Sequence, residues 1–137
     1  MHTLVSPEID AYCNAVSKAE SPILKQIREH AIANVHGAHM ISGPQVTGLM
    51  CMIIKMINAK RVLEFGTYVG YSAIAMAEAL SADGEIITME RNKQVAELAQ
   101  SWFDQSDVGN KITLKLGDID DTLPTLQGQF DFFFIDA

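Results

Sequence analysis

The segment with the clearest chemical signature is Arg61-Val-Leu-Glu-Phe-Gly-Thr-Tyr-Val-Gly-Tyr-Ser72. An apolar run leads into Glu64, then Gly66 and Gly70, and a small, Ala-rich helical pattern follows. This order predicts a strand, a tight loop and a helix, the nucleoside- or phosphate-binding corner of a Rossmann-like sheet. The spacing E-x-G-x-x-x-G is not the dinucleotide spacing G-x-G-x-x-G, and an acidic strand end would repel a pyrophosphate. The segment favours a site for a nucleoside with an amino-acid tail, whose ammonium group would pair with Glu64. The alternative is that the segment is a plain strand-to-helix turn without a ligand.

Three further acidic residues stand at or after the ends of predicted strands. Glu90 comes twenty residues after Gly70, where a carboxylate can accept hydrogen bonds from both ribose hydroxyls. Asp118 either lines an adenine pocket or caps the next short helix. Asp136 lies at the topological switch point of an open α/β sheet, which makes it a candidate metal ligand or cofactor-facing acid. Glu90 and Asp136 could also be ordinary strand-end residues, and one carboxylate does not hold a divalent cation alone.

Other potential ligands do not form a site. His36 and His39 lack nearby cysteine or acidic partners for zinc, so they are interpreted as loop or pocket-lid residues. Cys13 and Cys51 are expected to be buried, reduced thiols, as in a cytoplasmic protein. The N-terminus has no signal-peptide pattern, and the apolar run from Leu49 to Ile54 is too short to cross a membrane.

The elements that must position these residues fall into two regions. Residues 1–58 carry three helical patterns, and residues 59–137 alternate strands with helices. Such alternation predicts a parallel sheet with right-handed crossovers, hence an α/β fold. The predicted helices are Pro7–Lys18, Pro22–His30 or a little beyond, Pro44–Asn58, Tyr71–Leu80, Lys93–Gln105 and a short turn near Asp120–Leu126. The predicted strands are Val62–Phe65, Ile86–Met89, Ile112–Leu116 and Phe130–Ile135.

Composition limits the partners. The 137 residues include 48% hydrophobic and 20% charged side chains, which is typical of one globular domain. The net charge is −7, and no basic run is present, so nucleic acid is not expected as a partner. The fourth strand, Phe130–Ile135, would be central in a sheet of order 3-2-1-4-5. We therefore expect the chain to be the N-terminal part of a longer protein, since its fourth strand otherwise exposes an edge.

With these residues in view, the chain resembles the cation-dependent O-methyltransferase family, which includes caffeoyl-CoA and catechol O-methyltransferases and small bacterial relatives. The most specific block is Leu63–Ser72. The other blocks follow in order and at the expected intervals: Met40-Ile-Ser-Gly43, Lys55–Lys60, Ile87-Thr-Met-Glu90, Leu116-Gly117 and Phe130–Ala137. The resemblance implies a Rossmann-like methyltransferase fold and S-adenosylmethionine as the methyl donor.

The resemblance also implies residue roles. Glu64, Gly66, Tyr68, Gly70 and Ser72 would surround the methionine part and the loop, and Ser42 would close over the same end. Glu90 would hold the ribose, and Asp118 and Ile119 would flank the adenine. Asp136 would bind a divalent cation, Mg²⁺ or else Mn²⁺ or Ca²⁺, close to the donor.

Two departures from the family pattern matter. Val69 replaces a common Thr, and the family's Lys-containing segment, with the proposed base, and its Asp-Asn metal pair would lie beyond Ala137. The implied reaction is metal-assisted methyl transfer to a hydroxyl of a small, catechol-like or phenolic acceptor, carried out by a cytoplasmic homodimer. Two alternatives stay open: an NAD(P)-linked oxidoreductase, and a non-catalytic module that binds S-adenosylmethionine or a partner.

Overall fold

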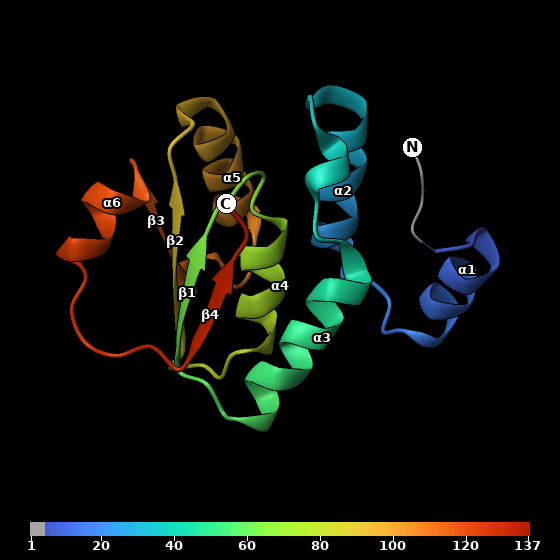
Figure 1. Ribbon diagram of the computed structural model, residues 1–137, viewed down its shortest axis with the longest axis horizontal. Helices are drawn as coiled ribbons and strands as arrows, with labels where there is room; N and C mark the ends of the chain where they lie inside the picture. The colour runs from blue at the N-terminus through green and yellow to red at the C-terminus, as the bar shows by residue number, and fades with distance from the viewer. Residues whose placement is uncertain (1–4) are drawn as a thin grey trace.

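A four-stranded parallel sheet forms the centre of the computed structural model, which describes residues 5–137 (Figure 1). Its order is β3-β2-β1-β4, as the sequence predicts. The strands are β1 (Arg61–Phe65), β2 (Glu85–Glu90), β3 (Ile112–Leu116) and β4 (Phe132–Ile135). Residues 1–4 of the predicted N-terminal region lie outside the described residues. The sheet brings the ends of β1, β2 and β4 together, although they are far apart in the sequence.

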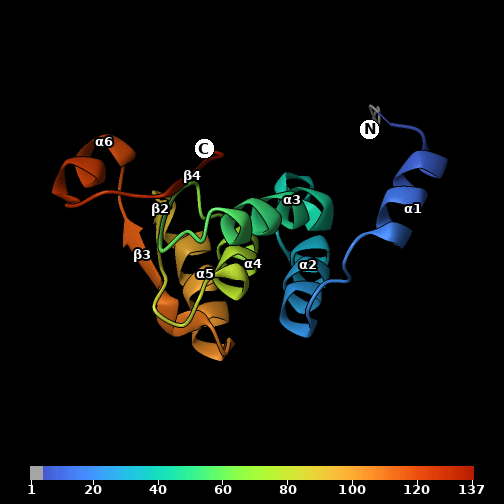
Figure 2. The same ribbon diagram turned by 90° about the horizontal axis from the view of Figure 1, so that it is seen from below.

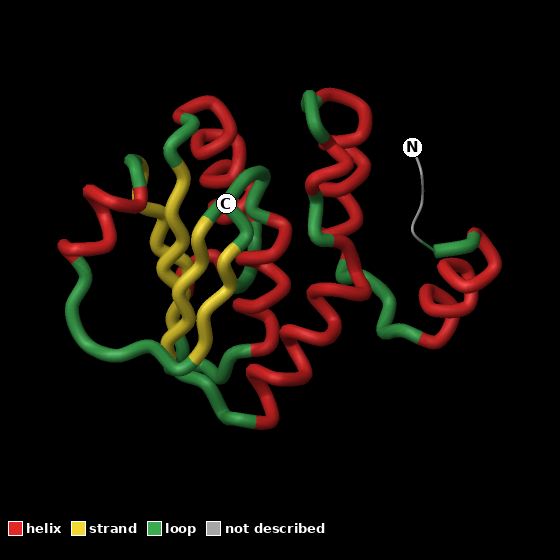
Figure 3. Tube along the Cα trace, in the orientation of Figure 1, coloured by secondary structure: helices red, strands yellow, loops and turns green. Residues whose placement is uncertain are grey.

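Helices precede and connect the strands (Figure 3). The α-helices are α1 (Pro7–Val16), α2 (Pro22–Asn34), α3 (Gly43–Met56), α4 (Tyr71–Ala79), α5 (Lys93–Gln105) and α6 (Ile119–Thr122). Short 3₁₀ turns are η1 (Ala38–Met40), η2 (Gly109–Lys111) and η3 (Leu123–Thr125). Every predicted helix is present, but α1 ends earlier and α2 later than expected. Ser6 caps α1 through its side chain, whereas Ser21 stands at the N-cap of α2 without a side-chain bond.

The two faces of the sheet are covered differently. Helices α4 and α5 lie on one face, and α6 lies on the other (Figure 2). Because strand side chains alternate, Val62 and Ile86 are buried toward α4, while Leu63 and Ile87 belong to a smaller cluster on the opposite face. Helix α4 is buried from Tyr71 to Ala77, which explains its small, Ala-rich sequence. The helix is therefore held firmly, with its first turn at the carboxyl end of β1.

Helix α1 is set apart from this core. It has no buried residue and lies at the edge of the molecule beside α3 (Figure 1). Across residues 5–137, helices are either too short or too polar to cross a membrane. The core that positions the site is thus the sheet with α2 to α5.

Candidate active site

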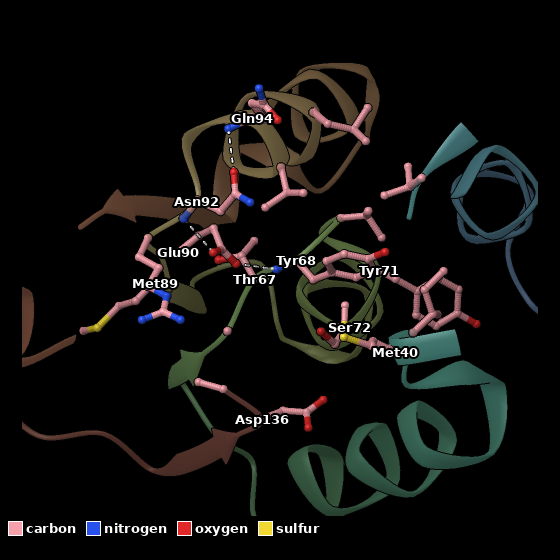
Figure 4. A pocket seen from close by; sticks show the side chains of 18 of the residues that line it. Met40, Thr67, Tyr68, Tyr71, Ser72, Met89, Glu90, Asn92, Gln94 and Asp136 are labelled. Carbon is pink, nitrogen blue, oxygen red and sulfur yellow. Dashed lines mark hydrogen bonds between the residues drawn. The ribbon is translucent and has the colours of Figure 1, made fainter. Parts of the chain in front are cut away.

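A hollow of about 1320 Å³ opens at the carboxyl ends of the strands (Figure 4). Ligand pockets commonly occupy roughly 300–1,000 Å³, so this one has room for a nucleoside and a further small molecule. Eight of the ten predicted site residues line it: Ser42, Gly66, Tyr68, Ser72, Glu90, Asp118, Ile119 and Asp136. Glu64 and Gly70 lie behind the lining. The fold therefore assembles most of the predicted set at the edge where ligands bind in open α/β sheets.

Glu90 is held by the main chain. One carboxylate oxygen accepts a hydrogen bond from the Tyr68 N–H at 2.9 Å, and the other accepts from the Asn92 N–H at 2.8 Å. Each oxygen has a further lone pair, so the group can accept two more hydrogen bonds from a ligand. Its rotamer is set in advance, which favours recognition of a vicinal diol such as a ribose.

The first turn of α4 offers donors to the hollow. The α4 helix begins at Tyr71 without a side-chain cap. Among the described residues, no hydrogen bond uses the N–H groups of Tyr71 and Ser72, and both residues line the hollow. Free N–H groups and the positive end of the helix dipole form a site for an anion such as a ligand carboxylate.

Glu64 lies directly beneath this turn and is fully buried. Its two oxygens accept hydrogen bonds from Ser72 Oγ and from Thr88 Oγ1. Burial raises the pKa of Glu64 to about 7, although the two hydroxyl bonds act in the opposite direction. The predicted ligand-facing carboxylate thus contacts hydroxyls in this structure, and Ser72 stands between it and the hollow.

The two glycines of the loop have different steric reasons. A Cβ on Gly66, whose φ is +94°, would stand 2.5 Å from the main-chain oxygen of Asp136. A Cβ on Gly70, with φ +83°, would stand 2.7 Å from the ring of Phe103 in α5. Gly66 therefore lets the loop lie against the end of β4, and Gly70 lets α4 pack on α5. Only Gly66 lines the hollow.

Segments on the opposite side partly cover the hollow. The Tyr68 hydroxyl donates a 3.0 Å hydrogen bond to the main-chain oxygen of His36, which ties the β1–α4 loop to the segment after α2. The Ser42 hydroxyl lies 3.5 Å from a carboxylate oxygen of Asp136. His36 and His39 line the hollow, which agrees with their interpretation as lid residues.

Several lining residues were missed by the sequence reasoning. They include Met40, Thr67, Met89, Arg91, Asn92, Gln94, Val95 and Leu98. Asn92 could have been found, because it follows Glu90 and is a good helix N-cap residue for α5. Met89 was interpreted only as part of a strand, and its place in the lining depends on where the sheet ends.

A metal site is not complete within residues 5–137. Asp136 is exposed at the end of β4, and no group of three or more His, Cys, Asp or Glu side chains in this range could hold an ion. Mg²⁺ and Ca²⁺ take six or more oxygen ligands. Asp136 could thus supply one part of a metal site, and these residues do not fit a full one.

The charge of the hollow indicates the kind of ligand it can take. Glu90, Asp118, Asp120 and Asp136 line it, against a single arginine, Arg91. An acidic hollow with one fixed carboxylate that has free lone pairs and one helix end that has free N–H groups fits a nucleoside that carries both a positive charge and a carboxylate. It suits a dinucleotide pyrophosphate poorly.

Comparison with known proteins agrees with this kind of ligand. The sequence profile described as O-methyltransferase matches residues 14–137. The chain is 32% identical to catechol O-methyltransferase of Mycobacterium tuberculosis, over 96% of this chain and 60% of that protein. It is 33% identical to caffeoyl-CoA O-methyltransferase of Petroselinum crispum, over 90% of this chain and 53% of that protein. The chain thus spans between half and two thirds of the length of these relatives.

Solved structures share the fold. The SAH-bound methyltransferase PaMTH1 of Podospora anserina superposes with a TM-score of 0.90 at 28% identity, covering 100% of this chain and 62% of that one. The O-methyltransferase TomG of Streptomyces achromogenes, in complex with SAM, gives 0.87 at 28% identity, covering 95% and 60%. The predicted Rossmann-like methyltransferase fold is confirmed, and the oxidoreductase alternative is not favoured.

Proposed function

This chain belongs to the O-methyltransferase family, and we propose that it binds S-adenosylmethionine in the hollow and uses it to methylate a hydroxyl group. One observation carries the proposal: the carboxylate of Glu90 is fixed by two main-chain N–H groups while its free lone pairs remain available beside the open helix end. Family membership and the cofactors named for the related structures, SAH and SAM, support the same ligand.

The residues would divide the work as follows. Glu90 would accept hydrogen bonds from the ribose hydroxyls, and Asp118 and Ile119 would flank the adenine. The N–H groups of Tyr71 and Ser72 would bind the ligand carboxylate. When bound, S-adenosylmethionine supplies a methyl group on a positively charged sulfur, which a hydroxyl oxygen can accept. The contribution of the chain is orientation and exclusion of water, which lower the entropic part of the barrier.

The acceptor and the metal are further parts of the proposal. Relatives are named for catechol and caffeoyl-CoA, so we propose a small phenolic or catechol-like hydroxyl acceptor. Asp136 would be one ligand of a divalent cation. Since the described residues do not complete such a site, no catalytic step is derived from the metal, and no catalytic base is assigned among them.

A homodimer is the proposed assembly. Exposed apolar side chains lie on α1, at Ile9, Tyr12 and Val16, and on α3, at Leu49 and Met52. A second copy of the chain would cover these faces, in agreement with the dimer that the family resemblance implies. Light scattering of the purified chain would give the mass, and a monomer at micromolar concentration would contradict this part.

Calorimetric titration with S-adenosylmethionine tests the central proposal, with NAD as the control ligand and with Mg²⁺ present or absent. We expect S-adenosylmethionine to bind and NAD not to bind. Preferential binding of NAD, or no binding of S-adenosylmethionine to a chain that circular dichroism shows to be folded, would overturn the proposal. Tighter binding in Mg²⁺ would support the role of Asp136.

A further inference from the structure

Glu64 is a fully buried carboxylate that has no cationic side chain as a partner in the described part of the chain. It makes none of the ion pairs found among residues 5–137. Burying a charge without an opposite charge is costly, so such a group tends to be neutral, or to be ionised only when a cation binds beside it. The function proposed above leaves this residue without a direct task.

Hydroxyl groups connect the buried carboxyl to the hollow by two routes. Ser72 Oγ bonds one carboxyl oxygen directly and lines the hollow. Thr88 Oγ1 bonds the other at 2.6 Å and lies 2.6 Å from the Oγ1 of Thr67, a residue of the lining. A hydroxyl both donates and accepts, so these chains can point toward a charged carboxylate or away from a protonated one.

The surrounding charges all act in one direction. Among residues 5–137, Asp136 beyond β4 and Glu90 at the end of β2 are the charged groups with the largest effect on Glu64, and both are negative. Helix α4 contacts the carboxyl through the Ser72 hydroxyl, and strand β2 contacts it through the Thr88 hydroxyl. A positive ligand in the hollow would be the first cation in the neighbourhood of this carboxyl.

We propose that binding of S-adenosylmethionine displaces one proton from Glu64, so that the carboxyl is neutral in the free chain and ionised beneath the ligand. The inference rests on the proposed function, because that ligand supplies the positive charge. The O–H bond of the carboxyl breaks, its electron pair stays on the oxygen, and the proton passes through the Ser72 or Thr88–Thr67 hydroxyls to water. The positive charge of the ligand thus replaces the charge of the released proton.

This places Glu64 as a positioning residue that acts through Ser72 and Thr67. Ionised, it would draw the Ser72 hydroxyl proton toward itself and leave the oxygen lone pairs facing the ligand ammonium. A neutral nucleoside such as adenosine brings no charge and would displace no proton. Because Glu64 can be neutral or ionised, the hollow would therefore bind cationic and neutral nucleosides differently.

Calorimetry in buffers of different protonation enthalpy measures the proton directly. The titration uses this chain with S-adenosylmethionine at pH 6.5, with a chelator present so that no metal ion contributes. Because the pKa of the free carboxyl is about 7, we expect release of about three quarters of a proton. The dissociation constant should be about fivefold lower at pH 7 than at pH 6. Adenosine should release none.

Two variants assign the proton. Glu64→Gln should bind with no buffer-dependent heat, whereas Glu97→Gln, a surface carboxylate on α5 that lies 3.7 Å from Lys93, should release as much as the wild type. If Glu64→Gln does not fold, Thr88→Val serves instead, because loss of one hydroxyl donor should move the midpoint of the pH profile upward.

The outcomes separate the two proposals. Binding of S-adenosylmethionine with heat that does not depend on the buffer would overturn the inference and leave the proposed function standing. Proton release that persists in Glu64→Gln, or an unmoved midpoint in Thr88→Val, would overturn it too. A folded chain that does not bind S-adenosylmethionine would overturn the proposed function and, with it, the inference.

Discussion

The charged side chains at the two ends of β1 differ in whether they have ion-pair partners. At the amino end, Arg61 pairs with Glu85, and the Lys60 ammonium lies 2.6 Å from Asp83. Asp131 also accepts hydrogen bonds there from the N–H groups of Lys60 and Arg61. At the carboxyl end, Glu64 and its neighbours Glu90 and Asp136 have no ion-pair partner among residues 5–137.

The difference shows at which end of β1 a bound ligand could compensate negative charge. The Lys60 ammonium lowers the pKa of Asp83 to about 2, because it donates a hydrogen bond to the ionised carboxylate, as the Ser81 hydroxyl also does. Burial raises the pKa of Glu64 to about 7. The carboxylates at the amino end thus have a cation or main-chain N–H groups as partners within the fold, whereas the carboxyl end keeps a negative set without ion-pair partners that a cationic ligand can balance.

The largest expected effect concerns the loop at the carboxyl end. Gly66→Ala should lower the free energy of unfolding by roughly 4 kcal/mol, from a strained φ and a Cβ against the main-chain oxygen of Asp136. Gly128→Ala, near the amino end, should cost only about 1 kcal/mol, mainly for its positive φ, because its Cβ meets the end of the Arg61 side chain and no main-chain atom. Urea unfolding of both variants measures this, and equal losses would break the contrast.

The pH dependence of stability should differ at the two ends. The folded-state pKa of Glu64 is raised from 4.5 to about 7, so the folded chain binds more protons than the unfolded chain between these values. Its contribution is complete below pH 4.5 and is lost as the pH rises through 7, a fall of about 3 kcal/mol in the free energy of unfolding. Asp83, with a lowered pKa, acts oppositely and loses its contribution as the pH falls from 3.8 toward 2.

Urea titrations from pH 4.5 to 8 would measure this slope. Glu64→Gln should remove the Glu64 part of it, while Asp83→Asn should leave the slope in this range unchanged. A slope that survives in Glu64→Gln would mean that another group is responsible.

The affinity for S-adenosylmethionine should depend on residues at the carboxyl ends of the strands and not on those at the amino ends. Glu90→Ala should weaken S-adenosylmethionine binding by roughly 1.5–3 kcal/mol, the range for hydrogen bonds to a charged group. Glu85→Ala, at the other end of the same strand β2, should bind as tightly as the wild type. Calorimetry checks both variants after circular dichroism confirms folding, and unchanged affinity in folded Glu90→Ala would refute the ribose assignment.

The smallest effect belongs to a surface ion pair. Glu85→Gln removes the partner of Arg61, whose side chain is 30% exposed, against 46% for Glu85. Exposed pairs contribute little, so we expect a loss below about 1 kcal/mol in the free energy of unfolding. Thermal unfolding at low and high salt measures it, and a loss above about 2 kcal/mol would show that the amino end is less solvated than its exposure indicates.

Much of the fold could be predicted because local patterns carry it. The four strands follow from apolar runs that alternate with helical periodicity, their order follows from the doubly wound type of sheet that such alternation predicts, and α5 has the bounds expected. Helix ends were less certain: α2 continues to Asn34, where packing of Ala31 in the core outweighs local signals. The chemistry at strand ends was predictable because carboxyl ends of parallel strands share one edge.

The sequence by itself determined that a buried strand with an acid near its end leads into a glycine-containing loop, and that three other acids stand at or just after the ends of the other strands. It could not determine what each of them touches. Only the tertiary structure decided that Glu64 lies behind Ser72 and contacts hydroxyls, that Gly70 serves packing against Phe103, and that Asn92 helps to hold Glu90. The physical reason is that burial and hydrogen-bond partners depend on residues distant in the chain, which local patterns do not specify.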